Sequence, residues 1–166
     1  MSKIWFTSDL HLGHKLASKM RGFDSVKEHD EDIIVKLIEQ TRPRDILFVL
    51  GDVAMSKESL QLLKAVPCRK KMLFGNHDEY GHEEYLKVFE SLHGFYKYKG
   101  VWLSHCPIHP QEMYRCKANI HGHIHKGAAT PELPFPYINM NWDFWGRAVD
   151  FQEDIKPIIK ENYNEG

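Results

Sequence analysis

The sequence is poor in cysteine, carries almost no net charge and contains no long hydrophobic run. Its three cysteines, Cys68, Cys106 and Cys116, are odd in number and irregularly spaced, which argues against a disulfide framework and favours a reducing compartment. No apolar run approaches the length of a membrane span. The apolar segment near the N-terminus ends at Asp9, too soon for a secretory signal. We therefore expect a cytoplasmic protein with no membrane partner.

Positive and negative charges nearly cancel, with 22 Lys and Arg against 23 Asp and Glu. The chain therefore has no global basic field that would draw it to nucleic acid. Nucleic acid stays open as a partner, but charge does not indicate it. The basic cluster at residues 69–71 is expected to be a solvated strand end. With 166 residues and no repeat, low-complexity segment or linker, the sequence predicts a single domain covering residues 1–166.

Histidine, in contrast, is abundant. The chain has 11 His, most of them near turn-like segments rather than on helical faces. Imidazole binds metals and transfers protons near neutral pH. The count is a first indication of metal chemistry, and it depends on support from the surrounding motifs.

Apolar, β-branched and aromatic runs predict strands at residues 3–8, 46–50, 69–74, 95–98, 101–104 and 137–145, the last with a period of two. Apolar residues at helical spacing predict helices from residue 24 or 25 to about 40, from 56 to about 65, from 83 to about 92 and from 151 onward. On the last strand, Trp142 and Trp145 are expected to pack in the core rather than stack on a substrate.

Polar residues follow the first three long strands directly. Asp9 and His11 come after the first, and residues two apart in an extended backbone point the same way, so both would face one point. The alternative is an Asx turn with an exposed His. Asp52 follows the second strand and is a candidate metal ligand, or else a helix cap or turn residue. Residues 75–78 (GNHD) follow the third with an amide, an imidazole and a carboxylate.

Histidines also follow two later strands. His105 and His109 lie in a loop that prolines stiffen. Alternation predicts that three more lie on one side of an extended segment: His121, His123 and His125. Three His at this spacing are hard to bury, because each ring nitrogen needs a partner, so a functional role is expected for at least two. Cys106 adjoins His105 but would point the other way in an extended segment, so it is not counted as a ligand.

Together, five strand ends carry potential ligands, and strand ends lying side by side form the rim where ligands bind in open α/β sheets. Mixed Asp, Asn and His ligands suit Mn, Fe, Zn, Ni or Co better than Ca or Mg. The number of ligands exceeds what one ion needs. Two divalent metal ions that share one carboxylate account for the pattern.

The ordered motifs resemble those of the calcineurin-like metallophosphoesterases, including small bacterial and phage members. The family's D-x-H, GD, GNH-D/E, H and GHxH motifs correspond to Asp9-Leu10-His11, Gly51-Asp52, Gly75-Asn76-His77-Asp78, His105 and Gly122-His123-Ile124-His125. The resemblance runs from the first strand to Asp143. It implies an α/β fold: a four-layer α-β-β-α sandwich with two mixed β-sheets and helices outside.

The resemblance also implies roles for individual residues. One metal would be held by Asp9, His11, Asp52 and His125. The other would be held by Asp52, Asn76, His105 and His123, with Asp52 as the bridge. As catalytic residues, His77 would contact the phosphate and protonate the leaving oxygen, and Asp78 would orient His77. Asn76 would also contact substrate, and a water acidified by the metals would attack phosphorus.

The resemblance narrows the substrate class as well. Residues 53–55 (VAM) and 79–80 (EY) stand where the protein phosphatases of the family carry arginines that bind phosphate, so phosphodiesterase activity is favoured over phosphoprotein phosphatase activity. The short chain implies an open site for a small phosphorylated substrate, either a phosphodiester or a phosphomonoester, such as a nucleotide. His14 and His109 are candidates for contacting that substrate or supporting a ligand. The alternatives are a nuclease acting on nucleic-acid ends and a non-catalytic metal-binding scaffold.

Overall fold

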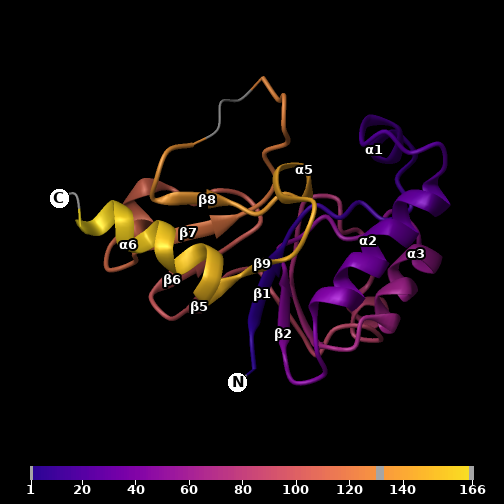
Figure 1. Cartoon of the computed structure of the whole chain (residues 1–166), viewed down its shortest axis with the longest axis horizontal. Coiled ribbons are helices and arrows are strands. Elements are labelled where there is room, and N and C mark those ends of the chain that lie inside the picture. The colour runs from indigo at the N-terminus through magenta and orange to yellow at the C-terminus, as the bar shows by residue number, and fades with distance from the viewer. Residues whose placement is uncertain (1, 130–132, 165–166) are drawn as a thin grey trace.

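The computed structural model describes residues 2–129 and 133–164, and these residues build two mixed β-sheets (Figure 1). The first sheet has the strand order β4 (Ser91–His93), β3 (Arg69–Leu73), β2 (Ile46–Val49), β1 (Ile4–Thr7) and β9 (Val149–Asp150). Adjacent strands in this sheet run parallel to each other, except that β9 runs antiparallel to β1. The second sheet has the order β5 (Tyr96–Tyr98), β6 (Val101–Leu103), β7 (Ala118–His121) and β8 (Tyr137–Asn139), with only the β5–β6 pair antiparallel.

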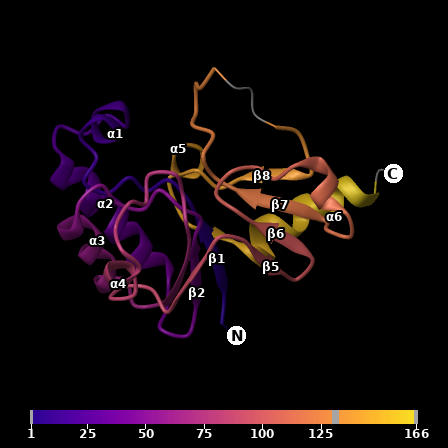
Figure 2. The same cartoon turned by 180° about the vertical axis from the view of Figure 1, so that it is seen from behind.

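Helices pack against both sheets. The first sheet carries α1 (Lys15–Met20), α2 (Val26–Gln40), α3 (Lys57–Leu62) with its short extension η1 (Leu63–Ala65), and α4 (His82–Tyr85) on the side away from the second sheet (Figures 1 and 2). The second sheet packs against η3 (Phe151–Ile155) and α6 (Lys156–Asn164). Two short elements, η2 (Pro110–Met113) and α5 (Trp142–Trp145), lie in the connections. Across the described ranges, no helix is both long and apolar enough to span a bilayer.

The central strands are buried on both faces, as the apolar run at residues 46–50 predicted. Leu47 and Val49 face α2 and α3, whereas Phe48 and Phe6 face the core between the sheets. The Phe6 and Phe48 rings stack there with centroids 5.6 Å apart. Parallel strands that are covered on both sides read as continuous hydrophobic runs. The predicted fold class, α/β with two mixed sheets, is confirmed.

Two predicted elements are wrong in extent. The helix expected at residues 83–92 stops at Tyr85, because Ser91–His93 forms β4 and pairs in parallel with Lys71–Leu73. The strand expected at residues 137–145 stops at Asn139. The side chain of Asn141 then accepts from the backbone N–H of Asp143 and caps α5. A tertiary strand pairing overrides the helical pattern in the first case, and a helix cap overrides the strand pattern in the second.

Trp142 is buried at 5% exposure, as expected, although it lies on α5 rather than on a strand. Lys70 differs from the prediction of a solvated strand end. It is 7% exposed, and its ammonium donates to the carbonyl oxygens of Val66 and Cys68 at 2.7 and 2.8 Å. Burial lowers the pKa of this ammonium. The short helix α1 had no predicted counterpart.

Phe48→Ala tests the core between the sheets. The substitution removes a ring that is 1% exposed and stacks on Phe6, so we expect the free energy of unfolding to fall by about 3–5 kcal/mol. Urea unfolding measures the change. Val35→Ala, on the exposed side of α2 at 50% exposure, is the matched control and should change stability by less than about 0.5 kcal/mol. Equal losses in both variants would contradict the assignment of Phe48 to the core.

Candidate metal centre and active site

The predicted ligands meet at one edge that both sheets share. Asp9 and His11 follow β1, Asp52 follows β2, Asn76 follows β3, His105 follows β6, and His123 and His125 follow β7. The loops after β1 and β2 run side by side, because the backbone N–H of Asp9 donates to the carbonyl of Gly51 and that of His11 to the carbonyl of Asp52, each at 3.0 Å. The two sheets therefore supply one site jointly.

The first group contains Asp9, His11 and His125, with Asp52 beside them. The Nε2 atoms of His11 and His125 lie 3.2 Å apart. The Asp9 Oδ1 atom is 3.5 Å from the His125 Nε2 and 3.9 Å from the His11 Nε2. The Asp52 Oδ2 atom is 3.8 Å from the His11 Nε2. Four electron-rich donor atoms thus converge within one small volume.

The second group contains Asp52, Asn76, His105 and His123. The His105 Nε2 atom lies 2.9 Å from the Asn76 Oδ1, 3.5 Å from the Asp52 Oδ1 and 3.2 Å from the His123 Nδ1. Asp52 is the residue common to both groups, because its Oδ2 faces the first and its Oδ1 faces the second. This is the arrangement expected of a carboxylate that bridges two ions.

The chemistry of these donors fits divalent metal ions. His105 donates from Nδ1 to the Leu50 carbonyl at 2.8 Å, so its Nε2 presents a lone pair to the oxygens of Asn76 and Asp52. Asp9 Oδ1 is buried and has no hydrogen-bond partner among the described residues. Buried polar atoms are normally paired, and lone pairs facing one another at such distances repel unless a cation lies among them.

Burial shapes the charges of the first group. It raises the pKa of the Asp9 carboxyl. It also lowers the pKa of His11 to about 3, with a further contribution from the neighbouring His125. His11 is therefore a neutral imidazole at neutral pH, the form that coordinates metals.

The backbone at this edge is strained. Four of the predicted ligands have a positive φ: Asp9 at 55°, His11 at 50°, Asp52 at 52° and His123 at 67°. Residues other than glycine rarely adopt this conformation, and such residues cluster at functional sites. Asp9 and His11 do converge as predicted, but through left-handed residues. The extended backbone from which that convergence was predicted is wrong.

Two motif glycines are required by close packing against ligands. A Cβ atom on Gly75 would collide with the Asp52 carboxylate, and one on Gly122 would collide with the Asp9 carboxylate and with Ser8. Glycine is the residue that allows such an approach of the backbone. The glycines of the GNH and GHxH motifs therefore make room for the two carboxylates.

Asp143 and Arg21 are site residues that the motifs did not assign. Asp143 Oδ2 accepts from the His125 Nδ1 at 2.7 Å, which leaves the His125 Nε2 free to coordinate. Arg21 donates to Asp143 and also to the carbonyl oxygens of Asp9 and Leu10. Asp143 lay on the polar face of the predicted last strand, which was its only signal in the sequence. Arg21, in a loop 12 residues from Asp9, had none.

Asp143 and Arg21 also influence the protonation of the His125–Asp143 pair. The hydrogen bond that His125 donates to Asp143 raises the pKa of His125. Burial alone would raise the pKa of Asp143, but the hydrogen bonds and charges of His125 and Arg21 hold it at about 2. Asp143 is therefore a carboxylate at neutral pH and serves as the acceptor that fixes the His125 ring.

Asp78 has a different role from the one predicted. Its two oxygens accept from the backbone N–H groups of Asp52, Val53 and Gly75 at 2.8, 2.9 and 2.7 Å. The carboxylate therefore ties the loop after β2 to the loop after β3, and it is not directed at the His77 ring. Within the described residues the expected orienting contact to that ring is absent.

His77 itself is exposed at the rim. Its backbone N–H donates to the Asp52 Oδ1 at 3.0 Å, and its ring centroid lies 6.1 Å from that of His11. The exposed imidazole ring is thus accessible to a ligand that binds beside the two groups of donor atoms. This position agrees with a residue that contacts substrate rather than metal.

The three motif-region histidines without a proposed metal, His14, His109 and His121, lie in three different environments. His14 caps α1 by accepting from Leu16 and Ala17, and its ring lies 5.4 Å from that of His11. His109 is exposed and caps η2 by accepting from Gln111. His121 is buried, and its Nδ1 donates to the Gly122 carbonyl at 2.8 Å. Burial lowers the pKa of His121 to about 4. The prediction that all three histidines of the GHxH region share one side is wrong for His121.

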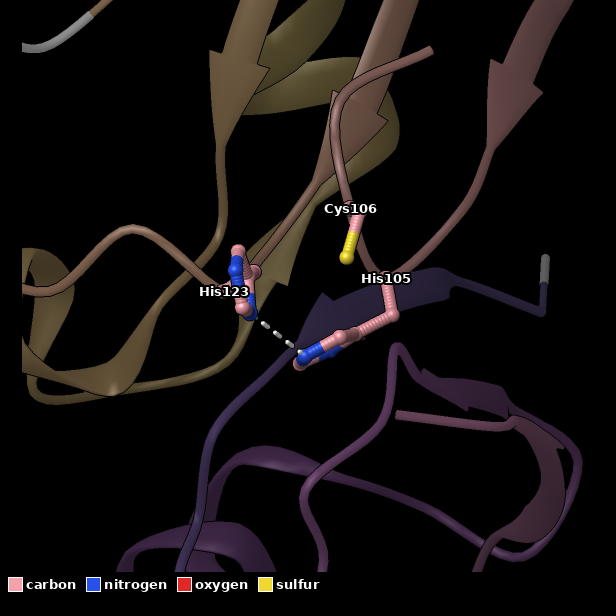
Figure 3. Close-up of side chains that lie close together, drawn as sticks. All are labelled: His105, Cys106 and His123. Atoms are coloured by element: carbon pink, nitrogen blue, oxygen red, sulfur yellow. Dashed lines mark hydrogen bonds between the residues drawn. The ribbon is translucent and has the colours of Figure 1, made fainter. Parts of the chain in front are cut away.

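Cys106 faces the second group, contrary to expectation (Figure 3). Its Sγ atom and ligand nitrogens of His105 and His123 all lie within 4.8 Å of one another. The segment after β6 bends at once instead of staying extended, and the bend turns the sulfur toward the two rings. Burial raises the pKa of this thiol, so it is protonated at neutral pH.

Known proteins are similar to this chain over most of its length. The calcineurin-like phosphoesterase family (Metallophos) matches residues 2–109. The Gene 66 protein of Mycobacterium phage L5 is 28% identical over 99% of this chain and 98% of its own length. The uncharacterized protein MJ1445 of Methanocaldococcus jannaschii is 31% identical over 84% of this chain and 77% of its own length. The crystal structure of AQ665, a protein of unknown function from Aquifex aeolicus, matches with a TM-score of 0.73 and 27% identity over 95% of this chain and 100% of that chain.

The two mixed sheets and the buried cluster of carboxylates and imidazoles at their shared edge define a metallophosphoesterase fold. The chain belongs to the calcineurin-like phosphoesterase family, a family of metal-dependent phosphoesterases, as its motifs predicted. The family match ends at residue 109, so the contribution of His123 and His125 comes from the geometry described above.

Asp143→Ala tests the support of His125. Loss of the acceptor frees the ring to rotate, so we expect Mn²⁺ affinity to fall about 10- to 100-fold. Calorimetric titration of metal-free protein measures the affinity. Asp24→Asn, at an exposed position away from the site, is the control and should bind Mn²⁺ like the parent protein. Unchanged affinity in the Asp143→Ala variant would contradict this role.

Proposed function

We propose that the protein is a dinuclear metal-dependent phosphoesterase that hydrolyses a small phosphodiester, with a nucleotide-like compound as the favoured substrate. The observation that carries the proposal is the pair of donor groups sharing Asp52, whose two oxygens face different histidine clusters. Asp9, His11, Asp52 and His125 would hold one ion. Asp52, Asn76, His105 and His123 would hold the other.

When bound, the two ions would supply positive charge to the phosphoryl oxygens and lower the pKa of the attacking water. The chain supplies the remaining functions. His77 lies at the exposed rim and is suited to contact the phosphate and to give a proton to the leaving oxygen. Asp78 keeps the loops of Asp52 and Gly75 in register, so it is a positioning residue.

A small phosphodiester is favoured over a phosphoprotein and over a polynucleotide, and catalysis is favoured over a non-catalytic role. Residues 53–55 and 79–80 lack the arginines that protein phosphatases of the family use on phosphate. The net charge of −1 also gives no general attraction for a polynucleotide, which weighs against a nuclease of nucleic-acid ends. A non-catalytic scaffold is disfavoured because such relatives lose ligands or the histidine at the position of His77, and this chain keeps them all.

Activity is expected to depend on metal. Treatment with a chelator should abolish hydrolysis, and addition of Mn²⁺, Ni²⁺ or Co²⁺ should restore it. A panel of phosphomonoesters, bis(aryl) phosphodiesters, cyclic nucleotides and short oligonucleotides measures both the dependence and the preference. Hydrolysis that persists in chelator would refute the metal mechanism. Turnover of oligonucleotides alone would favour the nuclease, and no turnover of any compound would favour the scaffold.

Asp52→Asn and His77→Asn should separate metal binding from proton transfer. Asp52→Asn removes the shared carboxylate, so occupancy of both ions should fall. His77→Asn should keep both ions and lower kcat about 10²- to 10⁴-fold, because the proton donor is lost. Elemental analysis and steady-state kinetics measure the two effects. His82→Asn, an exposed histidine on α4, is the control for surface effects. Equal metal loss in both site variants would contradict the separate roles.

A further inference from the structure

A pocket of about 660 Å³ opens beside the second group of donors. Asn76 and His105 belong to both, and Cys106, whose Sγ lies near ligand nitrogens of His105 and His123, also lines the pocket. The volume lies within the range of small-molecule sites. A group bound in this pocket would therefore lie next to a phosphate held at Asn76 and His105.

The walls of the pocket are mostly apolar and aromatic. Phe74, Phe95, Trp102 and Ile108 contribute to it from the loops after β3, β4 and β6 and from β6 itself. Phe95 is 64% exposed, so most of its ring surface is accessible to a ligand. Exposed aromatic rings that line a concave surface indicate a binding site for an apolar or aromatic ligand.

Two of the aromatic rings are fixed in place. Phe74 packs edge-on against the buried Tyr85, with ring centroids 5.6 Å apart. Trp102 donates from Nε1 to the carbonyl of Glu112 at 3.0 Å, and the ammonium of Lys97 lies 5.3 Å from its ring centroid. Because these rings are already ordered, the protein side chains lose little conformational entropy when a flat ligand stacks on them.

We propose that this pocket is the specificity subsite for a nucleobase, held as part of a nucleoside ester of the phosphate. A nucleobase is planar and stacks on aromatic rings, and it carries N–H groups at its edge. Glu112 lines the pocket and offers a carboxylate as acceptor for those groups. The same negative charge would repel the further phosphates of a polynucleotide, so the subsite suits a single nucleoside.

The subsite rests on the proposed function for the position of the phosphate. Two esters that share a leaving group separate the two ideas: the p-nitrophenyl ester of thymidine 5′-phosphate and methyl p-nitrophenyl phosphate. The enzyme loaded with Mn²⁺ should show a kcat/KM about 10-fold or more higher for the nucleoside ester, because only that compound places a base in the pocket. In Phe95→Ala and Trp102→Ala this ratio should fall toward one.

Tyr114→Ala is the matched control, because Tyr114 is an aromatic residue that is 75% exposed, lies on the connection between β6 and β7 and is outside the pocket lining. It should keep the parent ratio. Thermal unfolding of each variant checks that the fold is retained. Direct binding gives a second measurement: thymidine 5′-phosphate should bind the protein loaded with Mn²⁺ about 10-fold more tightly than inorganic phosphate, and Phe95→Ala should reduce that difference.

Equal kcat/KM values for the two esters in the parent enzyme would overturn the subsite while leaving the phosphoesterase intact. A preference that persists in both Phe95→Ala and Trp102→Ala would overturn it as well. Absence of metal-dependent hydrolysis of either ester would instead refute the proposed function. In that case tighter binding of thymidine 5′-phosphate than of phosphate, lost in Phe95→Ala, would still support a nucleotide-binding pocket.

Discussion

The position of one buried carboxylate, that of Asp52, sets the geometry of the whole edge. Its backbone is left-handed, its N–H is bound by Asp78, and its carbonyl accepts from His11. Its Oδ1 accepts from the backbone of His77 and faces His105, while its Oδ2 faces His11. A side chain held at so many points cannot rotate without breaking several hydrogen bonds. The loops after β1, β2 and β3 are therefore mutually dependent.

The surroundings explain why such a costly arrangement persists. Asp9 and Asp52 are both at most 1% exposed, and isolated buried carboxylates are strongly unfavourable. Here each has imidazoles within 4 Å, and two motif glycines let the backbone approach closely. The positive φ values of Asp9, His11, Asp52 and His123 add local strain. The rigid strands behind them, buried on both faces, can hold that strain.

Much of the fold, and the convergence of the candidate ligands at one edge, could be predicted, because polar residues directly after buried strands leave a strong local pattern. Asp9, Asp52 and His105 are examples, and the resemblance to one family ordered them. The prediction failed where a contact between distant residues decides the outcome. Residues 91–93 became a strand because Lys71–Leu73 lies beside them. Asp78 bonds to backbone groups of Asp52 and Val53, some 25 residues away, which no local pattern reveals.

Supporting residues were the hardest to foresee. Arg21 reaches Asp143 across 122 residues and has no signal of its own in the sequence, because a lone arginine in a loop looks like any solvated one. Cys106 was misplaced because an extended segment was assumed where the chain bends. Side-chain direction in irregular segments depends on left-handed residues, which periodicity does not report.

The joint contribution of the two sheets has a consequence for how the molecule is held together. His11 and His125 are separated by 114 residues, yet their ring nitrogens lie 3.2 Å apart. An ion bound between them would close a chain loop of that length, as a disulfide does, and so reduce the freedom of the unfolded chain. A metal ion at this position would then also cross-link the two sheets, in addition to the hydrophobic core between them.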